Sequence, residues 1–152
     1  MRPTISEQLR QTARLLEDVV APDLTSEYSA RVLRGLVKNL RMLETSWDQV
    51  VPFLQWDNEE TSKLLDASTH IVPAALAARL AARPSELPDP LDACAVQKHN
   101  YTIRGLLSEA ISEIDPASDH DSSVRNAITT HLKKRTSRYP MRMVPELAQS
   151  EA

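Results

Sequence analysis

Glycine is almost absent from this chain, and that scarcity limits its fold more than any other feature. Only Gly35 and Gly105 occur in 152 residues, whereas an average protein has roughly 7% glycine. The ten prolines separate stretches rich in leucine, alanine, arginine and glutamate, and apolar residues recur in those stretches with a helical period. The pattern predicts an all-α protein, an antiparallel bundle of about five helices.

The same scarcity argues against most known catalytic loops. Dinucleotide-binding turns, phosphate-binding loops and nucleophile elbows each need glycines at close spacing, because glycine adopts positive φ and lets a backbone approach a ligand. No histidine follows a glutamate by three residues, and no two histidines lie four apart, so helical di-iron and zinc motifs are missing. We therefore expect a non-catalytic protein with no cofactor and no metal.

Composition indicates one domain over residues 1–139, followed by a frayed C-terminal tail over 140–152. The net charge of −3 gives no overall attraction to nucleic acid or anionic lipid. No segment approaches the ~20 apolar residues of a membrane span, and the N-terminus lacks a signal-peptide run. Cys94 is the single cysteine, which excludes a disulfide framework. These features predict a cytoplasmic protein that does not bind membranes.

The first two helices have the clearest patterns. Thr4 and Glu7 have the spacing of a capping box, and Pro22 is expected to end the first helix. Asp23, Thr25 or Ser26 then caps a second helix. The apolar stripes expected to face the core are Ile5, Leu9, Ala13, Leu16 and Val20 in the first helix, and Tyr28, Val32, Leu36, Leu40, Leu43 and Trp47 in the second.

A third helical segment is expected over residues 46–80, kinked or broken at Pro52 and Pro73. Asp57 or Asn58 is a candidate N-cap after the first break. The stretch 83–90 contains three prolines and is the clearest linker. The pair Asp89-Pro90 is expected to open a fourth helix, and a fifth follows the polar run 118–123.

Four polar residues on the fourth helix form a candidate ligand site: His99, Asn100, Tyr101 and Arg104. In one interpretation they face a pocket between helices, and His99 acts as an acid, a base or a ligand anchor. In the other, which we favour, His99 is a partly buried side chain that satisfies its hydrogen bonds and fixes helix register.

Half of the six aromatic residues of the chain lie within ten positions of one another: Trp47, Phe53 and Trp56. They form either a partner-binding patch beside a proline bend or large side chains that fill the gap there. We favour the second interpretation, although this cluster is the best candidate for a binding patch.

The last helix and its tail are basic, with no acidic residue between Asp121 and Glu146. The cations proposed for partner binding are Lys133, Lys134, Arg135 and Arg138. Nucleic acid is not the expected ligand, because no aromatic residues alternate with these cations to stack on bases. An electrostatic docking surface for an acidic protein, or a solvated helix face, fits better.

Three segments resemble a known group of proteins: PTISEQLRQTARLLEDVVAPDL, SARVLRGLVKNLRMLE and HLKKRTSRYP, which together include the closing Arg138-Tyr139-Pro140. The chain looks like small uncharacterised all-helical bacterial proteins encoded beside aminoglycoside-phosphotransferase-like kinases and acyl-CoA-dehydrogenase-like enzymes. The resemblance covers about a third of the chain. It implies an accessory role near small-molecule activation or acyl catabolism, and it implies no catalytic residue.

We therefore expect a non-catalytic protein that binds another protein, for which such a kinase-like or flavin enzyme is the candidate. We also expect the chain to form a homodimer. The alternative is a small-ligand-binding protein or enzyme with a pocket between helices near His99.

Overall fold

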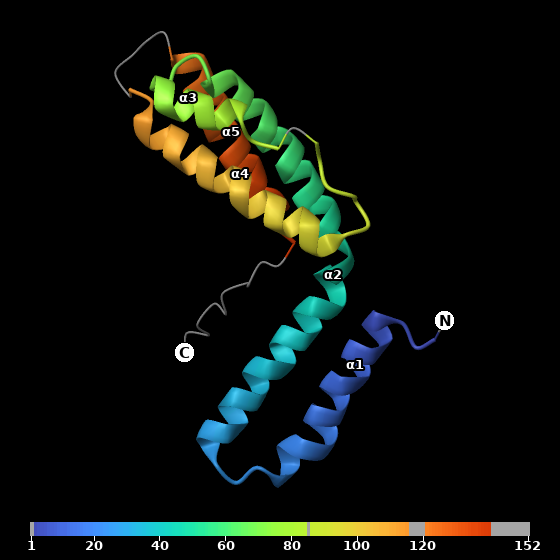
Figure 1. Ribbon diagram of the computed structural model, residues 1–152. Coiled ribbons are helices and arrows are strands. Elements are labelled where there is room, and N and C mark those ends of the chain that lie inside the picture. Colours follow the sequence, from blue (N-terminus) through green and yellow to red (C-terminus); the bar gives the residue numbers. More distant parts are fainter. Residues whose placement is uncertain (1, 85, 116–120, 141–152) are drawn as a thin grey trace. The chain divides into compact units, whose positions relative to one another are not determined.

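The computed structural model describes residues 2–84, 86–115 and 121–140, and these residues form five α-helices and no strand (Figure 1). The all-α prediction is confirmed. The helices are α1 (Ile5–Leu15), α2 (Glu27–Ser68), α3 (Ala74–Ala81), α4 (Ala93–Glu113) and α5 (Ser122–Arg138). A π-helical turn, η1 (Leu16–Val20), and a 3-10 turn, η2 (Ala21–Asp23), follow α1 directly.

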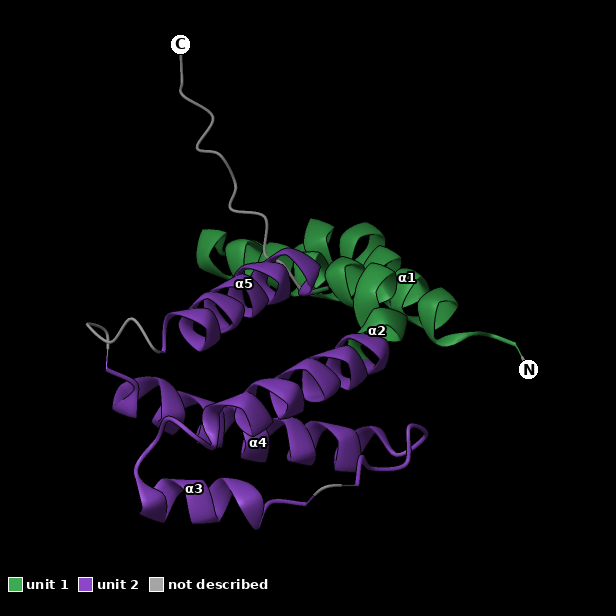
Figure 2. Cartoon of the chain, turned by 90° about the horizontal axis from the view of Figure 1, so that it is seen from above, with its two compact units in different colours: residues 1–50, 140–152 green, residues 51–139 purple. Residues whose placement is uncertain are grey.

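The chain divides into two compact units, coloured separately in Figure 2. Unit 1 comprises residues 1–50 together with 140–152, and unit 2 comprises residues 51–139. Helix α2 contributes its first part to unit 1 and its last part to unit 2. The expected C-terminal tail over 140–152 lies outside the described residues except for Pro140.

Unit 1 is a helical hairpin in which α1 and the first part of α2 run antiparallel (Figure 1). The expected capping box is present: the Glu7 amide donates to Thr4 Oγ1 at 3.2 Å, and the Thr4 amide donates to Glu7 Oε2 at 2.8 Å. Pro22 lies in the last helical turn before the loop, as expected. Of the three candidate caps for α2, Ser26 accepts a hydrogen bond from the Ser29 amide at 3.4 Å.

The core of unit 1 is small. Its buried residues are Ala13, Leu33 and Val37, and Leu16, Ala21, Leu24 and Leu40 pack around them. The first half of the stripe expected to be buried on α2 is instead exposed: Tyr28 is 68% exposed, Val32 45% and Leu36 52%. Further along the stripe, Leu40 does pack against the core. Helix α2 is apolar on two adjacent faces here, and the periodicity does not reveal which face α1 covers.

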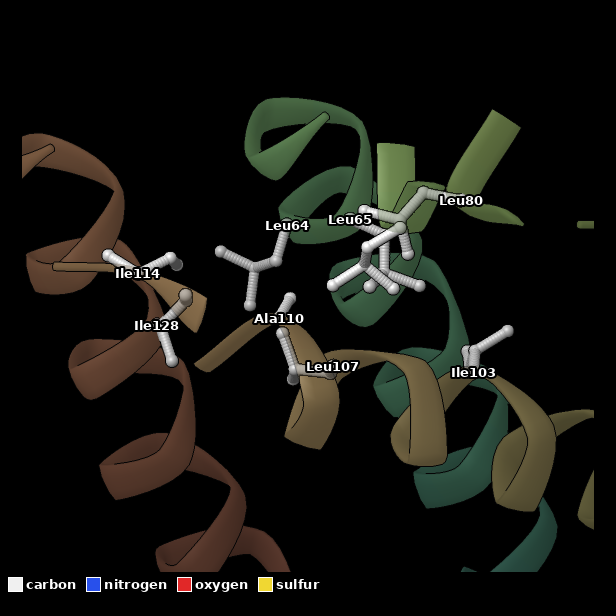
Figure 3. Close-up of a cluster of buried hydrophobic side chains, with 9 residues drawn as sticks. Leu64, Leu65, Leu80, Ile103, Leu107, Ala110, Ile114 and Ile128 are labelled. Atoms are coloured by element: carbon white, nitrogen blue, oxygen red, sulfur yellow. The ribbon is translucent and has the colours of Figure 1, made fainter. Parts of the chain in front are cut away.

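The core of unit 2 is larger and draws on all four of its helical segments. Its buried residues are Leu64, Leu65, Leu76, Leu80, Ile103, Leu107, Ala110, Ile114 and Ile128. Figure 3 shows Leu64 and Leu65 of α2 beside Leu80 of α3, with Leu107 and Ala110 of α4 directed toward the same space. Aliphatic side chains dominate, as the low aromatic content predicts.

Three boundary predictions need correction. Of the two outcomes expected at Pro52, a break or a kink, the break does not occur, because α2 continues through Pro52 to Ser68; one missing backbone hydrogen bond is not enough to end the helix. Asp57 and Asn58 are therefore buried residues inside α2 and not N-caps. The fourth helix begins later than expected, because Asp92 is its N-cap and accepts from the Ala95 amide at 2.9 Å.

The remaining breaks follow the sequence. Pro73 is the N-cap residue of α3, and the described part of the stretch 83–90 contains no helix. No described helix is both long enough and apolar enough to cross a membrane.

Candidate functional site

A fully buried carboxylate lies at the centre of unit 2. The Asp57 side chain in α2 is 0% exposed. Asn100 Nδ2 donates to Asp57 Oδ2 at 2.8 Å, and Arg135 Nε donates to the same oxygen at 3.0 Å. Arg104 approaches this oxygen at 3.7 Å, and His131 Nε2 lies 3.1 Å from Oδ1. One acidic side chain therefore joins three helices.

The spacing of its partners explains how the network assembles. Asn100 and Arg104 are four residues apart on α4, and His131 and Arg135 are four residues apart on α5. Side chains at this spacing lie on the same face of a helix, one turn apart. Helix α4 therefore presents an amide and a guanidinium to Asp57, and α5 presents an imidazole and a guanidinium.

The electrostatics of the site favour an ionised carboxylate. Burial raises the pKa of Asp57, but the close contact with His131, the hydrogen bonds from Asn100 and Arg135 and the charge of Arg135 outweigh burial and lower the pKa to about 2. The pKa of Arg104 is lowered because burial and the charge of Arg135 act against the attraction of Asp57. Two guanidinium groups thus compete for one carboxylate oxygen.

The hydrogen bonding at His131 is incomplete. Its Nε2 atom is at ion-pair distance from Asp57 Oδ1, but the direction is poor for a hydrogen bond, and Thr61 Oγ1 lies 3.4 Å from the same nitrogen. Among the described residues, the buried atoms Asp57 Oδ1, His131 Nδ1 and His99 Nε2 have no hydrogen-bond partner. Such buried atoms are infrequent in folded proteins.

Aromatic rings and further cations surround the network. The Trp56 and His131 ring centroids are 5.4 Å apart, and the Arg138 guanidinium lies 4.4 Å from the Trp56 ring. The Arg135 guanidinium lies 5.5 Å from the Phe53 ring. These distances are typical of cation–π contacts, so the aromatic rings shield part of the positive charge.

The four candidate ligand residues on α4 do not converge on one cavity. Asn100 and Arg104 join the Asp57 network, and Tyr101 is 71% exposed. His99 is half-buried, as expected, and its pKa is lowered by burial and by the charge of Arg83. The expectation that its hydrogen bonds are satisfied is wrong, because its buried Nε2 atom has no partner among the described residues. Asn100 and Arg104 are one turn apart, whereas Tyr101 points to solvent.

The aromatic triplet is divided between the two units. Trp47 belongs to unit 1, is 39% exposed and donates through Nε1 to Ser6 Oγ at 2.8 Å. Phe53 and Trp56 belong to unit 2, with ring centroids 6.0 Å apart. Phe53 is buried, and its ring packs edge to face against the ring of Tyr139. This arrangement is typical of core packing.

The basic residues of α5 also divide into two groups. Lys133 and Lys134 are exposed, and Arg138 is exposed above the Trp56 ring. Arg135 turns inward to the Asp57 carboxylate. Only part of the predicted basic patch therefore faces solvent.

Unit 1 has a different surface, with eight large apolar side chains exposed within 50 residues. They are Ile5, Leu15, Val19, Val20, Tyr28, Val32, Leu36 and Trp47. Tyr28, Val32 and Leu36 lie at four-residue spacing on successive turns of α2, and we call these three residues the uncovered stripe. A groove of about 570 Å³ also lies in unit 1, lined by Glu17, Ala21, Ala30, Leu33, Arg34, Val37, Lys38 and Arg41.

Sequence reasoning missed the centre of the site, because Asp57 and Asn58 fitted the pattern of a helix start. A usable signal exists, however. Asp57 lies four residues after Phe53 and four before Thr61, on a row that reaches the core residue Leu65. A carboxylate on the apolar face of a long helix requires partners, and the i, i+4 pairs on α4 and α5 supply them.

Among the described residues, no group of three or more histidine, cysteine, aspartate or glutamate side chains is placed to hold a metal ion. Comparisons with protein-family models, with curated proteins and with solved structures gave no match to this chain.

Proposed function

We propose that this protein is a non-catalytic accessory protein that binds another protein through the uncovered stripe of unit 1. The observation that supports this proposal is the exposure of Tyr28, Val32 and Leu36 on one face of α2. Contiguous exposed apolar surface is typical of interaction sites, whereas single exposed apolar residues are common on any protein.

The mode of binding follows from the shape of the stripe. Apolar side chains at i, i+4 and i+8 on a helix match the apolar face of a second helix, which packs ridges into grooves. The partner therefore presents an amphipathic helix or a helical hairpin of its own. Trp47, further along α2 in unit 1, is available for contact at its exposed edge.

The resemblance noted above suggests which partners to test first. They are a small-molecule kinase-like enzyme and an acyl-CoA-dehydrogenase-like enzyme from the same organism. A second copy of the chain is the other binding partner to test. If two copies associate through this stripe, their hairpins form a four-helix bundle.

The test combines binding with charge substitution in the stripe. The double variant Val32→Asp, Leu36→Asp should lose binding to the partner by at least about 100-fold, since two apolar contacts are replaced by desolvated charges. Thr45→Asp provides the matched control, because Thr45 is exposed on the same helix. Titration calorimetry measures the affinity, and analytical ultracentrifugation measures self-association.

Both substituted sites are already exposed to solvent, so circular dichroism should show an unchanged helix content. Equal binding by the double variant and the Thr45→Asp control would exclude the stripe as the docking surface. A chain that stays monomeric at 100 μM and binds neither enzyme would contradict the proposal itself.

A further inference from the structure

The Asp57 network contains more positive charge than its single carboxylate neutralises. Arg104 and Arg135 both reach Asp57 Oδ2, at 3.7 and 3.0 Å. The other acid that interacts with His131, Glu60, is paired with Lys63 at 2.6 Å. The guanidinium pair therefore retains at least one net positive charge next to Asp57.

Arg104 is the group with spare binding capacity. A guanidinium has five N–H donors, and within the described residues Arg104 meets only the 3.7 Å ion pair with Asp57, which is too long for a hydrogen bond. Its side chain is 32% exposed, so two thirds of it is desolvated. A partly buried cation without an acceptor is costly, and an external anion lowers that cost.

Both arginine side chains keep some exposure to solvent. The Arg135 side chain is 25% exposed, and Arg138 is exposed one turn further along α5. Burial and, after it, the like charge of Arg135 lower the pKa of Arg104. An anion between them would remove that repulsion and accept hydrogen bonds from both groups.

We propose that Arg104 and Arg135 form a binding site for a phosphate group, either inorganic phosphate or the phosphomonoester of a small molecule. Guanidinium groups bind tetrahedral oxyanions through paired N–H donors, and phosphate supplies enough oxygens to serve both arginines at once. Asp57 holds the pair in place and tunes its charge. The site lies in unit 2 and does not depend on the docking surface proposed for unit 1.

The experiment titrates inorganic phosphate into the full-length chain at constant ionic strength, with chloride as the background anion. Trp47→Phe leaves Trp56 as the single tryptophan, and Trp56 lies beside both His131 and Arg138. We expect saturable binding, seen as a change in Trp56 fluorescence and by calorimetry. Glycerol phosphate replaces inorganic phosphate in a second arm, and acetate in a third.

Three variants locate the site. Arg104→Gln should weaken phosphate binding by at least about tenfold, because it removes charge-assisted hydrogen bonds. Arg79→Gln is the matched control: Arg79 is exposed in unit 2 and paired with Glu109 at 2.5 Å, and its loss should leave affinity unchanged. Asp57→Asn should bind more tightly than the parent chain, because it removes the competing carboxylate.

The outcomes separate the possibilities. Tighter binding of glycerol phosphate than of inorganic phosphate identifies a phosphomonoester site, and the reverse identifies a site for the free ion. Absence of saturable binding, equal affinity in Arg104→Gln and Arg79→Gln, or a preference for acetate would overturn the proposal. Arg104→Gln keeps the test decisive if Asp57→Asn does not fold, because Arg104 is partly exposed and makes no short hydrogen bond.

Discussion

The two units differ in which side chains they bury and which they expose to solvent. Unit 2 buries nine apolar residues in one cluster and also buries a charged carboxylate with its partners. Unit 1 buries three apolar residues and exposes eight large ones. Among the described residues, unit 2 exposes six large apolar side chains but buries more than it exposes, whereas unit 1 exposes more apolar side chains than it buries. The same helical periodicity underlies both, so periodicity by itself does not separate a core from a docking surface.

The chain supplies a separate reporter for each unit, since Trp47 lies in unit 1 and Trp56 in unit 2. Trp56→Phe leaves a reporter of unit 1, and Trp47→Phe leaves a reporter of unit 2. Unfolding in urea, followed by fluorescence in these backgrounds, gives the free energy of unfolding that each tryptophan senses.

The largest effect is expected from Asp57→Ala. It removes the acceptor of Arg135 and Asn100 and leaves two partly buried cations, Arg104 and Arg135, without their counter-charge. The free energy of unfolding reported by Trp56 should fall by about 3–5 kcal/mol. Glu59→Ala, at an exposed acidic position in the unit 2 part of the same helix, should change it by less than about 0.5 kcal/mol. A comparably small loss in Asp57→Ala would mean that the network adds little to unit 2.

Leu65→Ala should be nearly as damaging. Leu65 is 0% exposed within the unit 2 core, and its truncation leaves a cavity that costs about 2–5 kcal/mol. Leu36→Ala in unit 1, where the side chain is 52% exposed, should cost well under 1 kcal/mol. Urea midpoints in the two single-tryptophan backgrounds measure the loss of stability in each variant. Similar losses in Leu65→Ala and Leu36→Ala would contradict the difference between the units.

Acid should weaken unit 2 through Asp57. The pKa of this carboxyl is 3.8 ordinarily and about 2 in the folded protein, so ionised Asp57 stabilises the fold above pH 4. That contribution, about 2 kcal/mol, is lost as the pH falls from about 4 to about 2. The Trp56-reported stability of the Asp57→Asn variant should therefore fall less steeply over this range. Parallel curves for the variant and the parent would disprove the linkage.

The smallest of these effects concerns unit 1. Thr4→Ala removes the acceptor of the Glu7 amide in the capping box and should cost about 1 kcal/mol. Trp47 fluorescence should report this loss of stability, because the Trp47 side chain is hydrogen-bonded to Ser6 in α1. Thr12→Ala serves as the control: Thr12 donates only to a backbone carbonyl within the helix. An equal loss in both variants would show that capping is not the cause.

Much of the fold can be predicted from the sequence, because helix ends have local causes. The capping box at Thr4 and Glu7 and the stops near Pro22 and Pro73 depend on neighbouring residues only. The sequence left open whether Pro52 breaks or kinks a helix, and the break does not occur, because α2 continues to Ser68. Which outcome follows depends on packing elsewhere in the chain. Local patterns carry little information about such long-range compensation.

The candidate site was only partly predictable. Asn100, Arg104 and Arg135 were singled out as polar or basic residues, but nothing in their spacing revealed that all three meet at Asp57. That meeting joins residues as far apart as 57 and 135, and it depends on how α4 and α5 pack against α2. Similarly, the choice of face that α1 covers on α2 is a tertiary outcome.

Pro52 gives the shared helix a consequence of its own. It lies within α2 two positions past the last residue of unit 1. Since proline has no N–H, the carbonyl of Asp48 loses the donor that a helix supplies four residues later. The hydrogen-bond ladder is therefore interrupted where one set of tertiary contacts gives way to the other. Away from the two ends of α2, amide exchange should therefore be fastest near Pro52, and local opening of the helix should start there.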